Sequence, residues 1–245
     1  MRISKVIARA GLCSRREAER WISMGRVSLK DRVIRDPALN VTLEDRIFVD
    51  GVIIPESQPT RLWRYHKPPG LITSNNDPKG RKTVFDRLPR SLPRVISVGR
   101  LDINSEGLLL LTNDGDLARH LELPKVGWSR RYRVRVHGKI DHERLESLKG
   151  GVNVSGVNYG PIDATLETKT GHNSWLMVSL REGKNREIRN VMAKLGLEVN
   201  RLIRVSFGPF QLGNLPRGKV EEVRSKALRE NLNIKTNRSR GTKRV

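Results

Sequence analysis

The spacing of hydrophobic residues changes from a helical period to a strand period near the start of this chain. Apolar residues three and four apart predict a helix over 3–10, which Gly11 ends. A second helix is predicted to start after Ser14, because Ser14 and Glu17 form a Ser-x-x-Glu capping box. Residues 27–53 then carry short apolar runs separated by turn residues, which predicts small strands joined by tight turns.

Beyond residue 61 the pattern favours strands over helices. Alternating or continuous apolar runs predict strands at 62–67, 95–98, 108–111, 132–136, 175–180 and 202–205. Apolar stripes at helical spacing predict helices at 84–88, 117–121, 141–149 and 188–195. Strands that outnumber helices and are joined by tight turns indicate an α+β domain with a mixed, mainly antiparallel sheet.

Two composition changes suggest the domain boundaries. Residues 55–60, Pro-Glu-Ser-Gln-Pro-Thr, form a short linker that is stiffer than a Gly/Ser tether. We therefore predict a small domain over 1–54, able to move as a unit with limited reach, and a larger domain over 61–231. Residues 232–245 are polar and basic and cannot bury enough apolar surface to order themselves, so a flexible tail is expected there.

The longest apolar run of the larger domain lies directly after a polar loop. Residues 108–111 are four leucines bounded by Gly107, which is typical of a strand buried on both faces. The preceding loop carries Arg100 and Asp102 next to this apolar strand. A carboxylate in such a place is costly unless it is paired or takes part in chemistry. On spacing alone, a structural Arg–Asp pair that closes a turn is the favoured interpretation.

The charge balance indicates a polyanionic partner. The chain has 48 Lys and Arg against 26 Asp and Glu, a formal net charge of +22, which nucleic acid would neutralise through its phosphates. A solubilising surface is the plain alternative, although solubility does not require so large an excess. An anionic membrane surface is another, but no apolar run approaches the ~20 residues of a spanning helix, and no lipidation motif is present.

The reactive side chains argue against metals and cofactors. The single cysteine, Cys13, excludes an internal disulfide and a thiolate metal cluster and fits a reducing compartment. The N-terminus lacks the pattern of a signal peptide, so the cytoplasm is the expected location. The five histidines are scattered, and no phosphate-binding loop or dinucleotide fingerprint occurs. We therefore expect no metal site and no cofactor.

Residues 99–102, Gly-Arg-Leu-Asp, and residues 105–115, Ser-Glu-Gly-Leu-Leu-Leu-Leu-Thr-Asn-Asp-Gly, resemble the signature of the RNA pseudouridine synthases. The resemblance is greatest to the subfamily of RsuA, RluB, RluE and RluF, which modify single uridines in ribosomal RNA. It implies that Asp102 is the catalytic nucleophile and that no cofactor takes part. The form of the motif resembles the large-subunit enzymes of this subfamily more than the small-subunit enzyme.

The same resemblance implies roles for residues elsewhere in the larger domain. Tyr132 matches a tyrosine that stacks on the target base, and Arg100 matches an arginine that fills the space left by the flipped base. The motif at 180–189 matches the segment that supplies a cation for the aspartate; the matching position is Lys184, with Arg189 as second choice, and Arg186 and Arg189 are expected to contact RNA. The alternatives are a packing aromatic for Tyr132 and an ordinary residue at a helix start for Lys184.

The two helices and short strands of the small domain resemble the RNA-binding module of ribosomal protein S4. That module binds RNA through basic residues of its second helix and the adjoining turn. The corresponding residues here are Arg15, Arg16, Arg20 and Arg26. A solvated charged helix face is the alternative for each residue, but the net charge of the whole chain favours RNA binding.

The leading hypothesis is therefore a ribosomal RNA pseudouridine synthase, expected to act as a monomer on large-subunit RNA. The alternatives are a small-subunit enzyme of the same kind and a non-catalytic RNA-binding or ribosome-assembly factor. A methyltransferase would need a Gly-rich cofactor loop after a strand, which is missing. The target uridine, and whether Asp102 attacks the sugar or the base, are left open.

Overall fold

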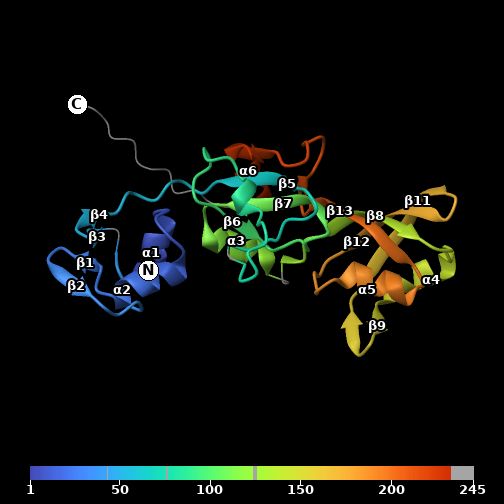
Figure 1. Ribbon diagram of the computed structural model, residues 1–245, viewed down its shortest axis with the longest axis horizontal. Coiled ribbons are helices and arrows are strands. Elements are labelled where there is room, and N and C mark those ends of the chain that lie inside the picture. Colours follow the sequence, from blue (N-terminus) through green and yellow to red (C-terminus); the bar gives the residue numbers. More distant parts are fainter. Residues whose placement is uncertain (43, 76, 124–125, 233–245) are drawn as a thin grey trace. The chain divides into compact units, whose positions relative to one another are not determined.

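The computed structural model describes residues 1–42, 44–75, 77–123 and 126–232, and its chain divides into two compact units (Figure 1). The first unit contains residues 1–61 together with 89–98 and 111–121, and the second contains the remainder. The predicted boundary at 55–60 lies just before the end of the first of these segments. Contributions from 89–98 and 111–121 were not predicted, because such long-range packing leaves no local pattern. The predicted tail lies outside the described residues except for Leu232.

The N-terminal part of the first unit packs two helices against a small antiparallel sheet. The helices are α1 (Ile3–Arg9) and α2 (Arg15–Ser23), and the sheet has the order β2-β1-β3-β4. Its strands are β1 (Val27–Leu29), β2 (Arg32–Ile34), β3 (Ile47–Val49) and β4 (Val52–Ile53). The buried core comprises apolar residues from both helices and the strands, among them Ile3, Ile7, Ala18, Ile22, Val27 and Ile47.

Local chemistry explains the ends of these elements. Ser14 Oγ accepts a hydrogen bond from the Glu17 amide at 3.1 Å, which confirms half of the predicted capping box. The Glu17 carboxylate accepts a hydrogen bond from Trp21 Nε1 at 2.8 Å instead of one from the Ser14 amide, which a full capping box would have. At the tip of the β1–β2 hairpin Lys30 adopts a left-handed φ of 49°, a conformation that glycine or asparagine adopts more easily.

Of the added segments of the first unit, 111–121 contacts helix α1. The added segments carry β6 (Ile96–Val98) and most of α3 (Gly115–Glu122). Lys5 on α1 forms an ion pair with Asp116 at 2.6 Å, and Arg9 forms one with Asp114 at 3.3 Å. Asp114 also accepts a 2.5 Å hydrogen bond from Thr60, so the turn after the leucine strand is held by charges as well as by apolar packing.

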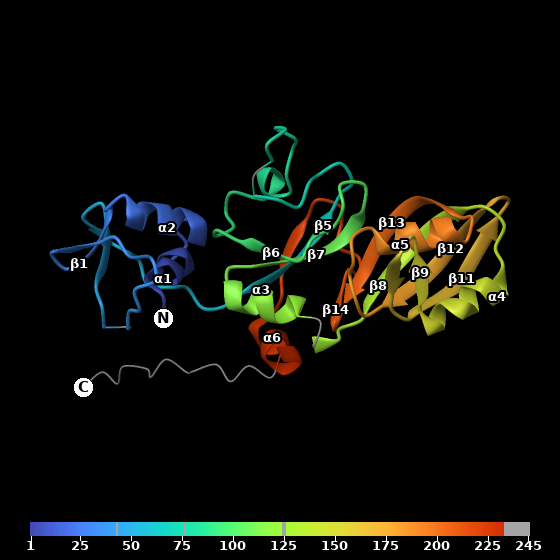
Figure 2. The ribbon, with the colours of Figure 1, turned by 90° about the horizontal axis from the view of Figure 1, so that it is seen from below.

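The second unit is built on a long mixed sheet with the strand order β11-β12-β8-β13-β7-β5-β15 (Figures 1 and 2). Neighbouring strands pair antiparallel at β11–β12, β12–β8, β8–β13 and β5–β15, whereas β13 and β7 are parallel. The predicted α+β fold with a mixed, mainly antiparallel sheet is therefore confirmed. The strands are β5 (Leu62–Lys67), β7 (Glu106–Thr112), β8 (Arg130–His137), β11 (Ile162–Thr170), β12 (Asn173–Leu180), β13 (Glu198–Phe207), β14 (Phe210–Gln211) and β15 (Val220–Glu222).

Helices cover one face of this sheet. Helix α5 (Glu187–Lys194) packs on β13, and α4 (His142–Ser147) packs on β11. Along β8 and β12 every second residue is buried, so Val134 and Val136 face the helices while Arg131 and Arg135 are exposed on the other face. Among the described residues, none of the helices has the length and apolar character needed to cross a membrane.

Several elements differ from the sequence prediction. The predicted helix at 84–88 is only a 3₁₀ turn, η1 (Phe85–Arg87), and a second 3₁₀ turn, η3 (Leu148–Gly150), follows α4. The hairpin β9 (Val152–Val154) and β10 (Val157–Tyr159), and helix α6 (Ser225–Leu232), were not predicted.

Gly107 lies inside β7 rather than at its boundary. A Cβ atom there would lie 2.3 Å from the Arg204 carbonyl oxygen, so only glycine allows β13 to approach so closely.

Candidate active site

A buried lysine holds the loop that carries Asp102. Lys67 ends strand β5, is 0% exposed, and donates hydrogen bonds from Nζ to the carbonyl oxygens of Asp102 at 3.1 Å and Ser105 at 2.8 Å. It donates further to the carbonyls of Pro68 and Ile103. Burial lowers the pKa of Lys67 to about 8, an effect that nearby Asp102 and Glu106 oppose.

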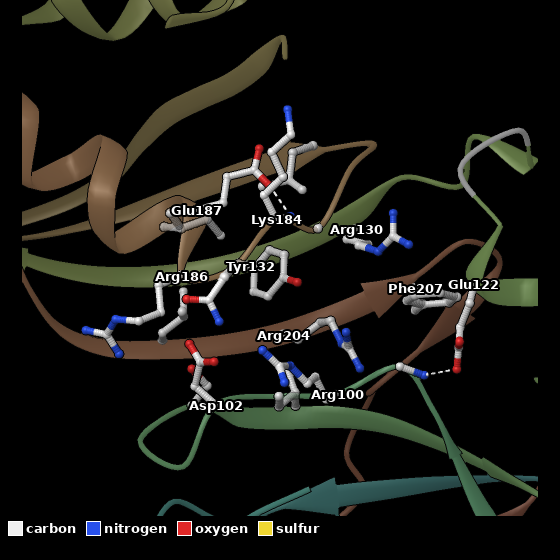
Figure 3. Close-up of a pocket in the computed structure, with 18 residues that line it drawn as sticks. Arg100, Asp102, Glu122, Arg130, Tyr132, Lys184, Arg186, Glu187, Arg204 and Phe207 are labelled. Carbon is white, nitrogen blue, oxygen red and sulfur yellow. Dashed lines mark hydrogen bonds between the residues drawn. The ribbon is translucent and has the colours of Figure 1, made fainter. Parts of the chain in front are cut away.

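The loop therefore has a defined backbone, which presents the Asp102 side chain to a pocket. This pocket has a volume of about 260 Å³ and lies wholly within the second unit (Figure 3). The loop forms one wall, and β8, β13 and the start of α5 form the others. The charged and aromatic residues of the lining are Arg100, Asp102, Glu122, Arg130, Tyr132, Lys184, Arg186, Glu187, Arg204 and Phe207.

The structure brings together several residues singled out in the sequence. Asp102 is half-buried, Tyr132 is 8% exposed, and both line the pocket with Arg100. Arg100 itself is exposed. Figure 3 shows Asp102 on the loop below Tyr132, which extends from the opposing strand. The pocket thus offers a carboxylate and an aromatic ring from opposite walls.

Lys184 lines the pocket, but its ammonium group is engaged elsewhere. Its Nζ forms an ion pair with Glu182 at 2.8 Å and donates a 2.5 Å hydrogen bond to the Asn158 carbonyl. Figure 3 shows the side chain pointing away from Asp102. The side-chain hydrogen bond to Glu182 accordingly raises the pKa of Lys184. The ion-pair partner of Lys184 in this structure is therefore Glu182, and its role as the cation for Asp102 stays a prediction.

The second choice from the sequence, Arg189, lies closer to the required place. It extends from α5 and donates hydrogen bonds to the carbonyls of Val199 at 2.9 Å and Asn104 at 3.4 Å, two residues beyond Asp102. Burial lowers the pKa of Arg189, and Arg186 lowers it further, whereas the charge of Asp102 raises it. Arg189 and Asp102 are therefore within electrostatic range of each other.

A buried carboxylic acid lies beside this group. Glu187 is 4% exposed at the start of α5 and accepts a 2.9 Å hydrogen bond from the Lys184 amide, while its Oε1 atom is buried without a partner. Burial raises the pKa of Glu187 to about 7, and neighbouring Glu182 contributes in the same direction. This side chain is thus substantially protonated at neutral pH.

Arg130, Arg204 and Phe207 line the pocket but were not proposed as site residues from the sequence. Arg204 is 3% exposed, and Phe207 is 2% exposed. The sequence carries no clear signal for Arg204, because it alternates with the apolar Ile203 and Val205 and would be expected on the more polar face of the strand. Its burial depends on long-range packing of β13.

The arginines predicted to bind RNA in the small domain lie on or next to α2. Arg15 forms an ion pair with Glu19 at 3.1 Å, Arg20 with Glu17 at 2.7 Å, and Arg26 with Asp50 at 2.5 Å. Arg16 is exposed and has no ion-pair partner among the described residues. RNA binding by these four arginines stays a prediction. Across the described ranges, no group of three or more His, Cys, Asp or Glu residues could hold a metal ion.

Comparison with known proteins identifies the family of this chain. A family model for RNA pseudouridylate synthase matches residues 61–194, and an S4 domain model matches residues 1–47. An uncharacterized RNA pseudouridine synthase of Rickettsia felis is 49% identical over 227 residues, which span 93% of this chain and 98% of that protein. The chain therefore belongs to the RNA pseudouridine synthase family and is an enzyme of that class with an N-terminal S4 domain.

Two further comparisons refine this picture. The ribosomal large subunit pseudouridine synthase B of Yersinia pestis is 41% identical over 233 residues, covering 92% of this chain and 73% of that protein. A crystal structure of a pseudouridylate synthase superposes with a TM-score of 0.65 at 23% identity over 94% of this chain and 99% of that one. The first supports membership of the RsuA and RluB subfamily, and the second supports the fold.

Proposed function

We propose that this enzyme isomerises one specific uridine to pseudouridine in ribosomal RNA of the large subunit, with Asp102 as nucleophile. The observation that carries the proposal is the placement of Asp102 in a pocket opposite Tyr132, on a loop whose backbone is held by Lys67. The large-subunit assignment rests on the named relative in Yersinia pestis. We further propose that the enzyme acts in the cytoplasm, where ribosomal RNA would be its substrate, and that it acts as a monomer.

The reaction that the pocket would support requires no redox change. The bond between N1 of uracil and C1′ of ribose breaks, a bond between C5 and C1′ forms, C5 loses its proton and N1 gains one. Asp102 would hold one fragment covalently while the other turns, which splits a difficult step into two easier steps. Attack on the sugar and attack on the base both remain compatible with this arrangement.

The remaining residues would support this step by position and charge. A uridine stacked in folded RNA must flip out to reach Asp102, at a cost of a few kcal/mol. Tyr132 would stack on the flipped base, and Arg100 would enter the space it leaves, since a guanidinium can stack and donate hydrogen bonds at once. Arg189 would attract the negatively charged Asp102 and help to position it, and the buried walls would limit access of competing water.

The test is a comparison of pseudouridine maps of ribosomal RNA from cells with and without the gene, made by carbodiimide modification. The expected result is the loss of one large-subunit site, which the purified enzyme restores on RNA from the deleted strain. Loss of a small-subunit site would contradict the large-subunit assignment. An unchanged map, with no site formed by purified enzyme, would contradict the proposal as a whole.

A further inference from the structure

Two arginines and one phenylalanine form a group at one end of the pocket, on strands β8 and β13. Across the antiparallel β8–β13 pair, Arg204 is opposite Tyr132 and Phe207 is opposite Arg130. The Arg130 guanidinium carbon lies 4.8 Å from the centre of the Phe207 ring, and that of Arg204 lies 5.3 Å from it. Both cations thus flank one ring, and Arg204 neighbours the tyrosine proposed to stack on the base.

The guanidinium of Arg204 is buried with most of its donors unused. Its Nε donates a 2.7 Å hydrogen bond to the Leu108 carbonyl, but its Nη2 is buried and has no acceptor among the described residues. Arginine presents five donors in a planar fork, so one bond leaves the larger part of this capacity free. A purely structural arginine at 3% exposure would be expected to find acceptors for its outer nitrogens.

The described residues provide no ion-pair partner for these two arginines. In the described part of the chain neither Arg130 nor Arg204 forms an ion pair, and Arg130 is bonded to the carbonyls of Trp128 and Arg181. Burial lowers the pKa of Arg130 and the charge of Arg204 lowers it further, whereas Tyr132 and Glu187 act in the opposite direction.

The carboxylates of the pocket have other neighbours. Asp102 is near Arg189, Glu122 accepts a 2.7 Å hydrogen bond from the Gly99 amide, and Glu187 has its pKa raised to about 7. Two like charges in a partly desolvated place require an anion from outside.

We propose that Arg204, together with Arg130, binds a backbone phosphate adjacent to the flipped uridine, with Phe207 as the rigid surface that holds both guanidinium groups. A uridine within RNA carries a phosphate on either side of its ribose, so the base cannot enter the pocket without bringing an anion near its rim. Planar guanidinium groups bind phosphate oxygens through paired hydrogen bonds. The identity of the ligand as a nucleotide rests on the proposed function.

The probes are uridine and uridine 3′,5′-bisphosphate, each titrated by NMR into the ¹⁵N-labelled full-length protein. The wild-type protein is expected to bind the bisphosphate at least about tenfold more tightly than uridine, because only the bisphosphate reaches the arginines. In Arg204→Met this preference should fall to within about twofold while uridine affinity is kept. Arg131→Gln is the matched control, since Arg131 lies on β8 next to Arg130 but is exposed on the opposite face.

An Arg204→Met protein that keeps the preference for the bisphosphate would overturn the proposal. If Arg204→Met does not fold, as its amide spectrum would show, Arg130→Gln decides: a reduced preference supports the phosphate site, and an unchanged preference overturns it. Inorganic pyrophosphate separates this inference from the proposed function. Arg204-dependent binding of pyrophosphate by a protein that modifies no uridine would leave the anion site in place while the proposed function fails.

Discussion

Lys67 Nζ lies 3.1 Å from the carbonyl oxygen of Asp102, so the last residue of strand β5 holds the backbone of the residue proposed to attack the substrate. The bond joins positions 35 residues apart in the sequence. A carboxylate nucleophile must be placed within a fraction of an ångström of its target, and loops alone rarely provide such precision. Here one fully buried ammonium group replaces the regular hydrogen bonding that a helix or strand would supply.

Replacing Lys67 by methionine should therefore damage both stability and catalysis. Methionine fills a similar volume but removes the Lys67 donor from four carbonyl oxygens, of which those of Asp102 and Ile103 keep a backbone donor, and we expect it to lower the free energy of unfolding by about 2–4 kcal/mol. The measurement is urea unfolding at pH 7, with Lys139→Met on the exposed surface as the matched control. A stability loss no larger than that of the control would show that Lys67 does not hold the loop.

Asp102→Asn should separate binding from chemistry. Asparagine keeps the shape of the side chain but is a far weaker nucleophile, so kcat should fall by more than about 10⁴-fold. Affinity for ribosomal RNA should stay within about twofold of the wild type, because the arginines proposed to contact phosphate are unchanged. Both are measured on RNA from a deletion strain, and residual turnover at a tenth of the wild-type rate would remove Asp102 from the nucleophile role.

Arg189 and Lys184, two basic residues of one motif, can be compared for their effect on catalysis by Asp102. Arg189→Met should lower kcat by about 10²-fold, because it removes a half-buried positive charge that acts on Asp102. Lys184→Met should lower kcat by less than about fivefold, because the exposed Lys184 pairs with Glu182. Single-turnover rates at saturating enzyme measure both effects, and a larger loss for Lys184 would restore the assignment that the sequence suggested first.

The contrast between Lys184 and Arg189 shows where sequence analysis was sufficient and where it was not. The loop with Asp102 and the strand with Tyr132 could be predicted because a long motif and strict alternation define them locally. The direction of a lysine side chain depends on which charged groups lie near it, and Glu182, two residues earlier, holds the Lys184 ammonium group away from Asp102. The sequence pattern does not show which of two nearby carboxylates a lysine will pair with.

Long-range packing limited the prediction in the same way. Gly107 looked like the boundary of the leucine strand, yet it is an internal residue that lets the backbone of Arg204 approach. Burial of Arg204 follows from the same approach and could not be inferred from its own neighbours in the sequence. The β9–β10 hairpin was overlooked because its strands are short and largely exposed, which leaves little hydrophobic signal.

Glu187 gives a prediction for the dependence of stability on pH. Burial and the nearby Glu182 raise its pKa from 4.5 in the unfolded chain to about 7 in the folded protein. Between these values the folded state binds more protons than the unfolded state, so this residue makes stability fall as the pH rises from 4.5 to 7. Glu187→Gln keeps an acceptor for the Lys184 amide and removes the titration, so it should be more stable than the wild type above pH 7 by about 1–3 kcal/mol.

The difference in free energy of unfolding between Glu187→Gln and the wild type should be smallest near pH 4.5, grow as the pH rises, and level off above pH 7. Urea unfolding at a series of pH values measures it, and Glu143→Gln on the exposed surface of α4 is the matched control, for which the difference should stay near zero. A constant difference between Glu187→Gln and the wild type would mean that the carboxyl group does not titrate in this range. If Glu187→Gln were less stable than the wild type above pH 7, the ionised carboxylate would be the form that stabilises the fold.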